Sequence, residues 1–143
     1  ISEKVPDEGY SLEIGKANLH TEGDDLSIIT YGMGVHWASK ICEELDVHAD
    51  ILDLRSLSPI DYDTINQTVQ KTNRVILLTE DTMTGSIMSD ISAYIAENLF
   101  EYLDAPLIRV ASLDTPFPFA ASLEKQFLPV DRLREKIQLL LSY

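Results

Sequence analysis

Short runs of β-branched and aliphatic residues alternate along this chain with longer segments whose apolar residues recur at helical spacing. Such runs indicate strands buried on both faces, and strands that alternate with helices form parallel sheets. We therefore predict an α/β fold whose right-handed crossovers place helices on both faces of the sheet. The predicted strands are residues 26–31, 49–54, 74–79 and 107–111, and the predicted helices are residues 35–45, 61–71, 87–102 and 132–141.

The predicted domain spans residues 26–143, and residues 1–25 form a predicted linker and edge segment that leads into it. This segment is polar and acidic, with one candidate strand at residues 12–17. The chain starts without a Met or a signal-peptide pattern, so we expect it to be excised from a longer protein. Asp61 and Asp131 each precede a helical segment and are predicted N-caps.

Composition narrows the class of protein. The net charge of −13 argues against nucleic-acid binding, and it fits either a basic protein partner or simple solubility. No run of about 18 apolar residues is present, so no membrane span is predicted. The single cysteine, Cys42, excludes an internal disulfide and a thiolate metal cluster. We expect Cys42 to be buried on a helix, which fits a cytoplasmic protein.

A proline-rich segment at residues 103–129 has too little periodicity to be one helix or one strand. Proline fixes its own φ and pushes the preceding residue toward an extended conformation, so this segment should be a loop of fixed shape. Such a loop presents a surface, and its aromatic residues favour self-association into a homodimer. The predicted subunit-interface residues are Thr115, Pro116, Phe117, Pro118, Phe119 and Phe127.

Two features sit where ligands bind open α/β sheets, at the carboxyl ends of strands. Gly32-Met33-Gly34 lies between a strand and a helix, but Trp37 stands where a dinucleotide fingerprint needs a third glycine. The segment is interpreted as a tight turn, with an anion site as the alternative. His36 is interpreted as a surface or interface residue, with a crevice ligand as the alternative.

The remaining polar residues do not assemble a complete catalytic set. The three histidines lack zinc-ligand spacing, and neither a nucleophile elbow nor a phosphate-binding loop is present. Carboxylates gather at strand ends, where a pair could serve a hydrolase. We instead expect Glu80 and Asp81 to hold Arg55 or Arg109 in a structural ion-pair network at these strand ends. No catalytic, cofactor-binding or metal-binding residue is predicted in this chain.

Several segments, in order and spacing, resemble the C-terminal domain of the β subunit of thiamine-diphosphate-dependent 2-oxo acid dehydrogenases, the E1 component. The matching pieces are Gly15-Lys16-Ala17, Ile29-Thr30-Tyr31-Gly32, Asp53-Leu54-Arg55-Ser56-Leu57-Ser58-Pro59-Ile60-Asp61, Glu80-Asp81 with Thr84-Gly85, Tyr102-Leu103-Asp104-Ala105-Pro106, Arg109-Val110, Asp114-Thr115-Pro116-Phe117-Pro118, Leu123-Glu124-Lys125 and Leu128-Pro129. Leu123-Glu124-Lys125 looks more like the 2-oxoisovalerate (branched-chain) branch than the pyruvate branch. Ser86 departs from the pattern, because many relatives have glycine there.

The resemblance implies a transketolase C-terminal fold: a three-layer α/β/α sandwich with a mainly parallel five-stranded sheet and one antiparallel edge strand. It implies that thiamine diphosphate and Mg²⁺ belong to other E1 α and β regions, and that the isolated chain is inactive. It also implies a noncatalytic role in assembly and in docking the subunit-binding domain of the E2 acyltransferase. The family's docking positions match Asp104 and the carboxylate of Tyr143. The expected location is the cytoplasm, or the mitochondrial matrix in a eukaryote.

Three other readings remain open at this stage. The chain could be the equivalent domain of a pyruvate dehydrogenase E1 β subunit. It could also come from a transketolase or a deoxyxylulose-phosphate synthase, where basic residues for a sugar phosphate would be expected at the carboxyl edge. A stand-alone hydrolase using a carboxylate pair is the third alternative.

Overall fold

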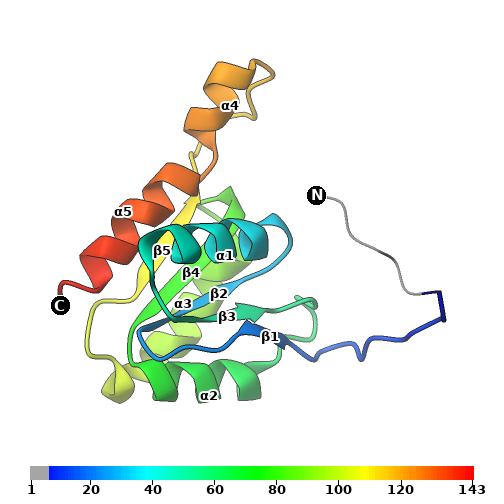
Figure 1. The fold of residues 1–143 in the computed structure, drawn as a ribbon, viewed down its shortest axis with the longest axis vertical. Coiled ribbons are helices and arrows are strands. Elements are labelled where there is room, and N and C mark those ends of the chain that lie inside the picture. The colour runs from blue at the N-terminus through cyan, green and yellow to red at the C-terminus, as the bar shows by residue number, and fades with distance from the viewer. Residues whose placement is uncertain (1–6) are drawn as a thin grey trace.

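Strand pairing in the computed structural model, which describes residues 7–143, gives one five-stranded sheet in the order β1-β3-β2-β4-β5 (Figure 1). β1 pairs antiparallel with β3, and every other pairing is parallel. The strands are β1 (Asn18–Thr21), β2 (Leu26–Thr30), β3 (Ala49–Asp53), β4 (Val75–Thr82) and β5 (Ile108–Ser112). This arrangement confirms the mainly parallel sheet with an antiparallel edge strand.

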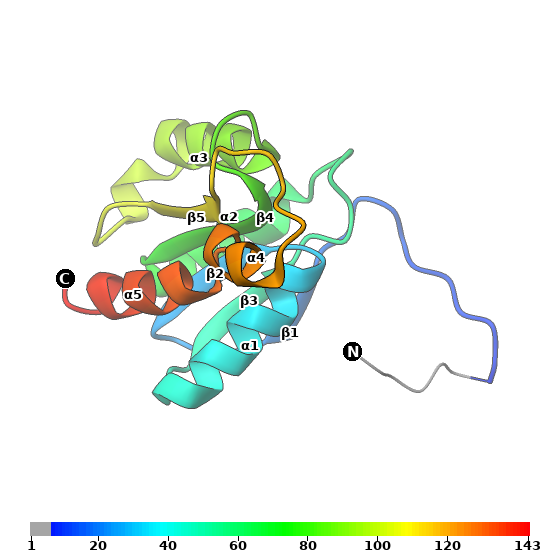
Figure 2. The same cartoon turned by 90° about the horizontal axis from the view of Figure 1, so that it is seen from above.

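Helices cover both faces of the sheet, as Figure 2 shows. They are α1 (Met33–Leu45), α2 (Tyr62–Thr72), α3 (Ile87–Asn98), α4 (Ala121–Phe127) and α5 (Val130–Leu140), with a 3₁₀ turn η1 (Phe100–Tyr102) after α3. α1 and α5 pack on one face, and α2 and α3 pack on the other. The predicted three-layer α/β/α sandwich is therefore confirmed.

The two cores follow from the alternation of side chains along each strand. Ile28 of β2 and Ile76 of β4 contact the α1–α5 layer, whereas their neighbours Ile29 and Leu77 contact the α2–α3 layer. All five residues of β2 are buried. This is why the central strands are mainly apolar and do not alternate between apolar and polar residues.

The edge of the sheet differs from the prediction. The strand predicted at residues 12–17 is wrong, because β1 lies at Asn18–Thr21 and Leu12 and Ile14 are exposed. The chain turns just before β1, where Gly15 has φ +79° and the backbone N–H of Ala17 donates to the carboxylate of Asp61. A β-carbon at position 15 would lie 2.8 Å from Pro59, so this turn requires glycine.

Of the two predicted N-caps, one is confirmed and the other is wrong. Asp61 caps α2 and accepts from the backbone N–H of Thr64 at 3.2 Å, as predicted. Asp131 is not a cap: Pro129 occupies the N-cap position of α5, and Asp131 lies in the first turn. There its charge still complements the helix dipole. The helix predicted over 87–102 is divided, because α3 ends at Asn98 and η1 follows.

The parallel strands give the sheet two functionally different ends. The loops after β2, β3, β4 and β5 all leave from the carboxyl ends of the strands. Residues 113–129, which include α4, rise from this edge and project from the body of the molecule (Figure 1). We call residues 113–129 the arm. The chain end after α5 returns to the opposite edge, close to the segment that leads into β5 in both ribbon views.

Candidate functional site at the two ends of the sheet

The four residues of the predicted strand-end network do not meet. Arg55 leaves β3 with a left-handed backbone, φ 54°, and folds back on Asp53, with Nε 3.7 Å from Oδ2. Arg109 donates from Nη1 to the hydroxyl of Ser89 at 2.7 Å. Between residues 7 and 143 the structure contains no ion pair that joins Glu80 or Asp81 to either arginine. Local contacts of each arginine therefore replace the expected network.

A different contact joins the loops at the carboxyl edge. Asp114 accepts two hydrogen bonds from Thr84, from the backbone N–H at 2.9 Å and from the hydroxyl at 2.7 Å. These two bonds hold the pKa of Asp114 below its usual range, with a smaller contribution from the charge of Arg109. The sequence signal was the Asp-Thr-Pro start of the proline-rich segment, but no spacing rule pointed to Thr84.

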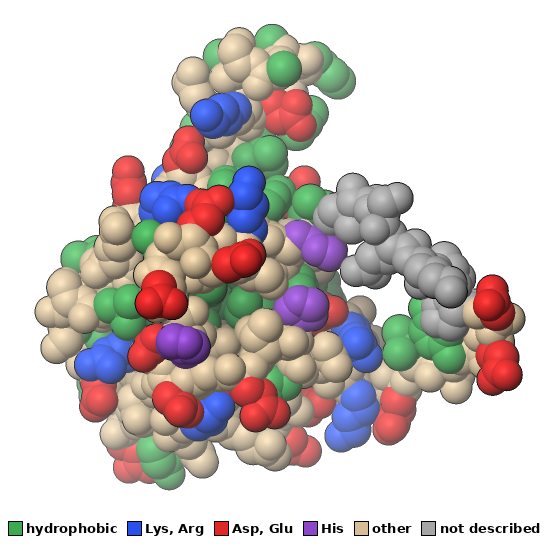
Figure 3. All heavy atoms as spheres, in the orientation of Figure 1, with side chains coloured by type: hydrophobic (Ala, Val, Ile, Leu, Met, Phe, Trp, Pro, Cys, Tyr) green, Lys and Arg blue, Asp and Glu red, His purple; other side chains and the backbone are tan. Residues whose placement is uncertain are grey.

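The arm carries the aromatic residues that were predicted to form an interface. Phe117 packs edge-on against Phe127 at a centroid distance of 5.4 Å and against Phe119 at 6.2 Å. Phe127 is buried, whereas Phe117 is 50% exposed and Phe119 is 99% exposed. Thr115 and Pro116 are exposed and Pro118 is half-buried. The space-filling view shows hydrophobic side chains at the outer end of the molecule (Figure 3).

Arg132 fastens the base of the arm to the sheet. Its Nη2 donates to the carbonyls of Ala111 and Phe127, both at 2.8 Å, and its Nη1 donates to the carbonyl of Gln126 at 3.0 Å. An arginine fork that bonds several carbonyls fixes the geometry of the segments that it joins. Sequence reasoning missed both this role and the helix α4, because the prolines dominated the local pattern.

Asp104 and Tyr143 lie at the other end of the sheet. The side chain of Asp104 is exposed, and its backbone N–H donates to the carbonyl of Asn73 at 2.9 Å, beside the start of β4. Tyr143, at the chain end, is 62% exposed. Next to Asp104 an apolar cavity of about 500 Å³ lies between Phe100, Leu103 and Leu107. An apolar hollow with an acidic rim suits a partner that combines aliphatic and basic side chains.

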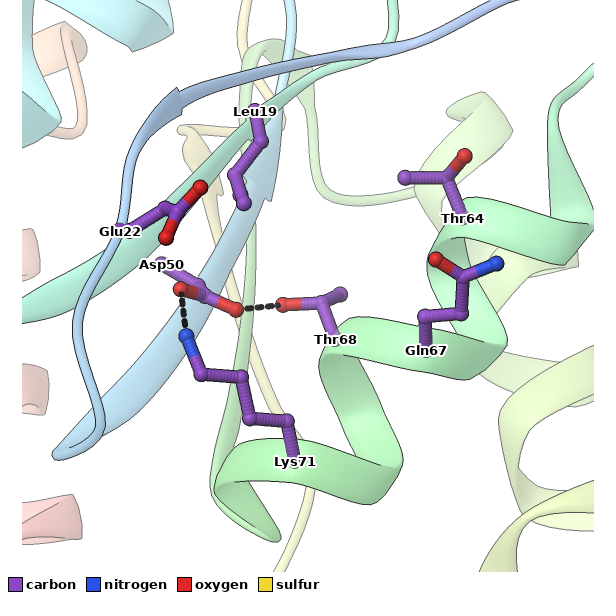
Figure 4. Close-up of a pocket in the computed structure, with 7 residues that line it drawn as sticks. All are labelled: Leu19, Glu22, Asp50, Thr64, Gln67, Thr68 and Lys71. Atoms are coloured by element: carbon purple, nitrogen blue, oxygen red, sulfur yellow. Dashed lines mark hydrogen bonds and ion pairs between the residues drawn. The ribbon is translucent and has the colours of Figure 1, made fainter.

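One buried carboxylate lies between the sheet and α2 (Figure 4). Asp50 of β3 is 1% exposed and accepts from Lys71 Nζ at 2.7 Å, from the Thr68 hydroxyl at 2.8 Å and from the backbone N–H of Gly23 at 2.9 Å. The hydrogen bond to Asp50 raises the pKa of Lys71. Because these groups satisfy one another, we interpret this cluster as structural.

Ser27 of β2 extends this cluster into a buried chain of hydroxyl groups. Its Oγ lies 2.7 Å from the hydroxyls of both Thr68 and Thr72, and it donates to the carbonyl of Thr68 at 3.1 Å. Thr72 also bonds the carbonyl of Arg74 at 3.2 Å. Ser27 of β2 is thus paired with Thr68 and Thr72 of α2 across the interior of the domain.

The predicted burial of Cys42 is confirmed. Burial raises the pKa of its thiol to about 11, and the nearby charge of Asp25 adds to the effect. A thiol with this pKa carries almost no thiolate at neutral pH, so Cys42 is a poor nucleophile.

No group of three or more His, Cys, Asp or Glu side chains within residues 7–143 is placed to hold a metal ion. None of the helices over these residues has the length and apolar character needed to cross a membrane.

Residues 15–132 match the protein family described as transketolase, C-terminal domain. The chain is 44% identical over 132 residues to the 2-oxoisovalerate dehydrogenase subunit beta of Bacillus subtilis (strain 168), covering 90% of this chain and 40% of that protein. It is 43% identical over 130 residues to the pyruvate dehydrogenase E1 component subunit beta of the same bacterium, covering 89% and 40%. The chain thus spans about 40% of the length of these relatives.

Solved structures give the same architecture. The fold superimposes on a split gene transketolase, described as an inactive beta4 tetramer, with a TM-score of 0.79. The two are 23% identical, and the match covers 98% of this chain and 46% of the other. At that level of identity the likeness concerns the fold.

Proposed function

Because this chain belongs to the transketolase C-terminal domain family, we propose that it is the C-terminal region of the β subunit of a 2-oxo acid dehydrogenase E1 component. In this proposal it serves assembly and E2 docking and is inactive in isolation. The observation that carries the proposal is the arm, in which the side chain of Phe119 is 99% exposed. An exposed aromatic cluster on a rigid base is typical of a protein interface.

The described residues do not fit the cofactor that the family uses. Thiamine diphosphate with Mg²⁺ needs a diphosphate-metal site, and residues 7–143 offer no such cluster of ligands. We therefore assign cofactor chemistry to other E1 regions and derive no reaction step in this chain. Calorimetry with thiamine diphosphate should give no saturable heat that depends on Mg²⁺, and a micromolar dissociation constant that requires Mg²⁺ would contradict this assignment.

The choice of oxo acid belongs to the proposal as well. Identities of 44% and 43% to the two relatives do not separate 2-oxoisovalerate from pyruvate. We propose the 2-oxoisovalerate type from the segment Leu123-Glu124-Lys125, with the pyruvate type as the alternative. The reconstituted full-length enzyme should decarboxylate 2-oxoisovalerate with a higher kcat/KM than pyruvate, and the reverse ratio would select the alternative.

We assign the arm to contacts between subunits of the E1 assembly, with a homodimer of this chain as the simplest case. Phe119→Ser removes an aromatic ring that contacts only Phe117 among the described aromatic rings. In sedimentation at high concentration, the unmodified chain should associate and Phe119→Ser should weaken that association. Leu12→Ser is a matched control, because it removes an exposed apolar side chain outside the arm. A chain that stays monomeric at all concentrations would contradict the homodimer.

Docking of the E2 subunit-binding domain is assigned to Asp104 and the carboxylate of Tyr143. Their exposure and their place at the same end of the sheet support this assignment. In full-length E1, Asp104→Ala should weaken E2 binding, because truncating one partner of a desolvated charge pair costs about 2–5 kcal/mol. Decarboxylation with an artificial electron acceptor should stay unchanged.

A matched variant makes the docking test specific. Asp90→Ala removes the same charge from an exposed site at the start of α3. It should leave E2 binding unchanged. Equal losses for the two variants would mean that net charge drives the association, and the assigned docking end would then be incorrect.

A further inference from the structure

A second cavity, of about 550 Å³, opens at the carboxyl edge between β1, the end of β3 and the start of α1. His20 of β1, His36 of α1 and Arg55 after β3 all line it. These three basic side chains come from segments far apart in the sequence, and the fold brings them to one hollow. Neither the docking end nor the arm contributes a residue to this cavity.

Arg55 is held in place by its own backbone and by Asp53. Its φ of 54° is unusual for a long side chain. Its backbone N–H donates to Asp53 Oδ1 at 3.1 Å, and its Nε lies 3.7 Å from Oδ2. Neither Nη atom of Arg55 has a hydrogen-bond partner among residues 7–143. The Nε edge of the guanidinium therefore lies near a carboxylate, while its outer nitrogens remain available.

The remaining wall adds donors and positive potential. α1 starts at the cavity, where Gly32 is the N-cap residue, and it has neither a side-chain cap nor an acidic residue in its first turn. The positive end of the helix dipole is therefore uncompensated by its own helix. Two imidazoles and one guanidinium face a single carboxylate, Asp53. Arg55 and Asp53 offset each other, so the cavity has no net negative charge even with neutral imidazoles, in a chain whose net charge is −13.

We propose that this cavity binds a small phosphate-bearing anion. A guanidinium with free outer nitrogens matches the geometry of phosphate oxygens, and the imidazoles and the start of α1 add further donors. The proposal concerns binding alone and assigns no reaction to this cavity. The inference stands apart from the proposed assembly and docking roles, because it rests on none of their residues.

The test is a titration of the isotope-labelled 143-residue chain with inorganic phosphate, followed by NMR. Ionic strength is kept low and constant with chloride, because salt screens exposed charges. Saturable shifts are expected at the amides of Gly32, Met33 and Arg55. Arg55→Gln should weaken binding about tenfold, as expected for losing charge-assisted hydrogen bonds. Arg55→Gly is a second variant, which accepts the positive φ and loses the same charge.

Control variants test whether phosphate binds in this cavity or responds only to the overall charge of the chain. Arg109→Gln removes an arginine whose guanidinium lies on Ser89, outside this cavity, and it should leave phosphate affinity unchanged. The double variant His20→Asn, His36→Asn should weaken binding further than either single change. Equal weakening by Arg109→Gln, or the absence of saturable shifts, would overturn the proposal. Tighter binding of malonate than of phosphate would replace the phosphate class with a dicarboxylate.

Discussion

Asp114 and Thr84 connect the loop after β5 to the loop after β4 through two hydrogen bonds of 2.9 and 2.7 Å. Thr84 is exposed, so we expect these bonds to be what slows exchange of its backbone N–H. The arm begins one residue before Asp114. The contact therefore determines where the arm leaves the carboxyl edge of the sheet.

Replacing Asp114 with alanine should loosen this junction without unfolding the domain. Hydrogen exchange at the Thr84 amide should accelerate roughly three- to tenfold, because the exposed N–H loses its acceptor. Asp131→Ala, which removes an exposed carboxylate of α5, should leave that amide unchanged. Because the hydrogen bonds lower the pKa of Asp114, the contact should persist below the ordinary carboxyl pKa and be lost as pH falls through the lowered value.

Asp61 should contribute more to stability than an ordinary cap. Burial pushes its pKa up, but hydrogen bonds from Ala17 N–H and from the N–H and hydroxyl of Thr64 outweigh burial and lower the pKa. Asp61→Ala should reduce the free energy of unfolding in urea by about 2 kcal/mol, since a cap is lost and a backbone donor loses its acceptor. Asp63→Ala, in the exposed first turn of the same helix, should cost less than about 1 kcal/mol.

The lowered pKa of Asp61 also predicts the direction of its pH dependence. A carboxyl group whose pKa is lower in the folded state stabilises the protein fully above its unfolded pKa. That contribution falls as pH decreases through the folded pKa. The stability difference between the parent chain and Asp61→Ala should therefore shrink on acidification below the ordinary carboxyl range. A difference that grows in acid would show that the charged form is not the stabilising one.

Gly34 should not accept even a methyl group. A β-carbon there would clash with the side-chain oxygen of Thr30, which is buried and has no hydrogen-bond partner among the described residues. Gly34→Ala should destabilise the domain by about 1–3 kcal/mol, although alanine favours helices. Thr30→Ala in the same chain should recover most of the loss, and a double-mutant cycle measures this coupling. Additive effects would contradict the clash.

Truncating two aromatic rings of the arm should have very different effects on stability. Phe127 is 7% exposed, so Phe127→Ala should cost about 3 kcal/mol in the free energy of unfolding. Phe119→Ala should change it by less than about 0.5 kcal/mol, because the ring is almost fully exposed. Thermal unfolding at a concentration where the chain is monomeric checks both. A large loss for Phe119→Ala would place that ring inside the folded unit.

The sequence predicted the interior better than the edges. Ile28, Ile76 and their neighbours are buried on both faces, so these mainly apolar runs indicated buried strands, and their alternation with helices indicated a parallel sheet. β1 was misplaced because Leu12 and Ile14 look like strand residues, whereas a turn at Gly15 and the bond from Ala17 to Asp61 decide where pairing starts. Pairing of an edge strand depends on such distant contacts, which local patterns do not contain.

In the candidate site, too, local sequence patterns predicted some features, whereas contacts between distant residues decided others. The exposure of Phe119 was expected from its proline-rich surroundings, since a stiff loop presents its side chains. The link from Asp114 to Thr84 spans 30 residues, and the anchoring by Arg132 depends on carbonyls of α4 and β5. Arg55 was assigned acidic partners across the sheet, but its left-handed backbone directs it to Asp53. Single backbone angles of this kind cannot be read from residue type.

The buried hydroxyls of Ser27, Thr68 and Thr72 have a consequence for the uniqueness of the fold. Apolar contacts between α2 and the sheet are non-directional, so they would tolerate small shifts of the helix along the sheet. The hydroxyl chain and the carboxylate of Asp50 do not tolerate such a shift. It would leave several buried oxygens without hydrogen-bond partners. This polar cluster therefore specifies the alignment of α2 on the sheet. It favours the native alignment over near-native alternatives that the hydrophobic effect alone would stabilise equally.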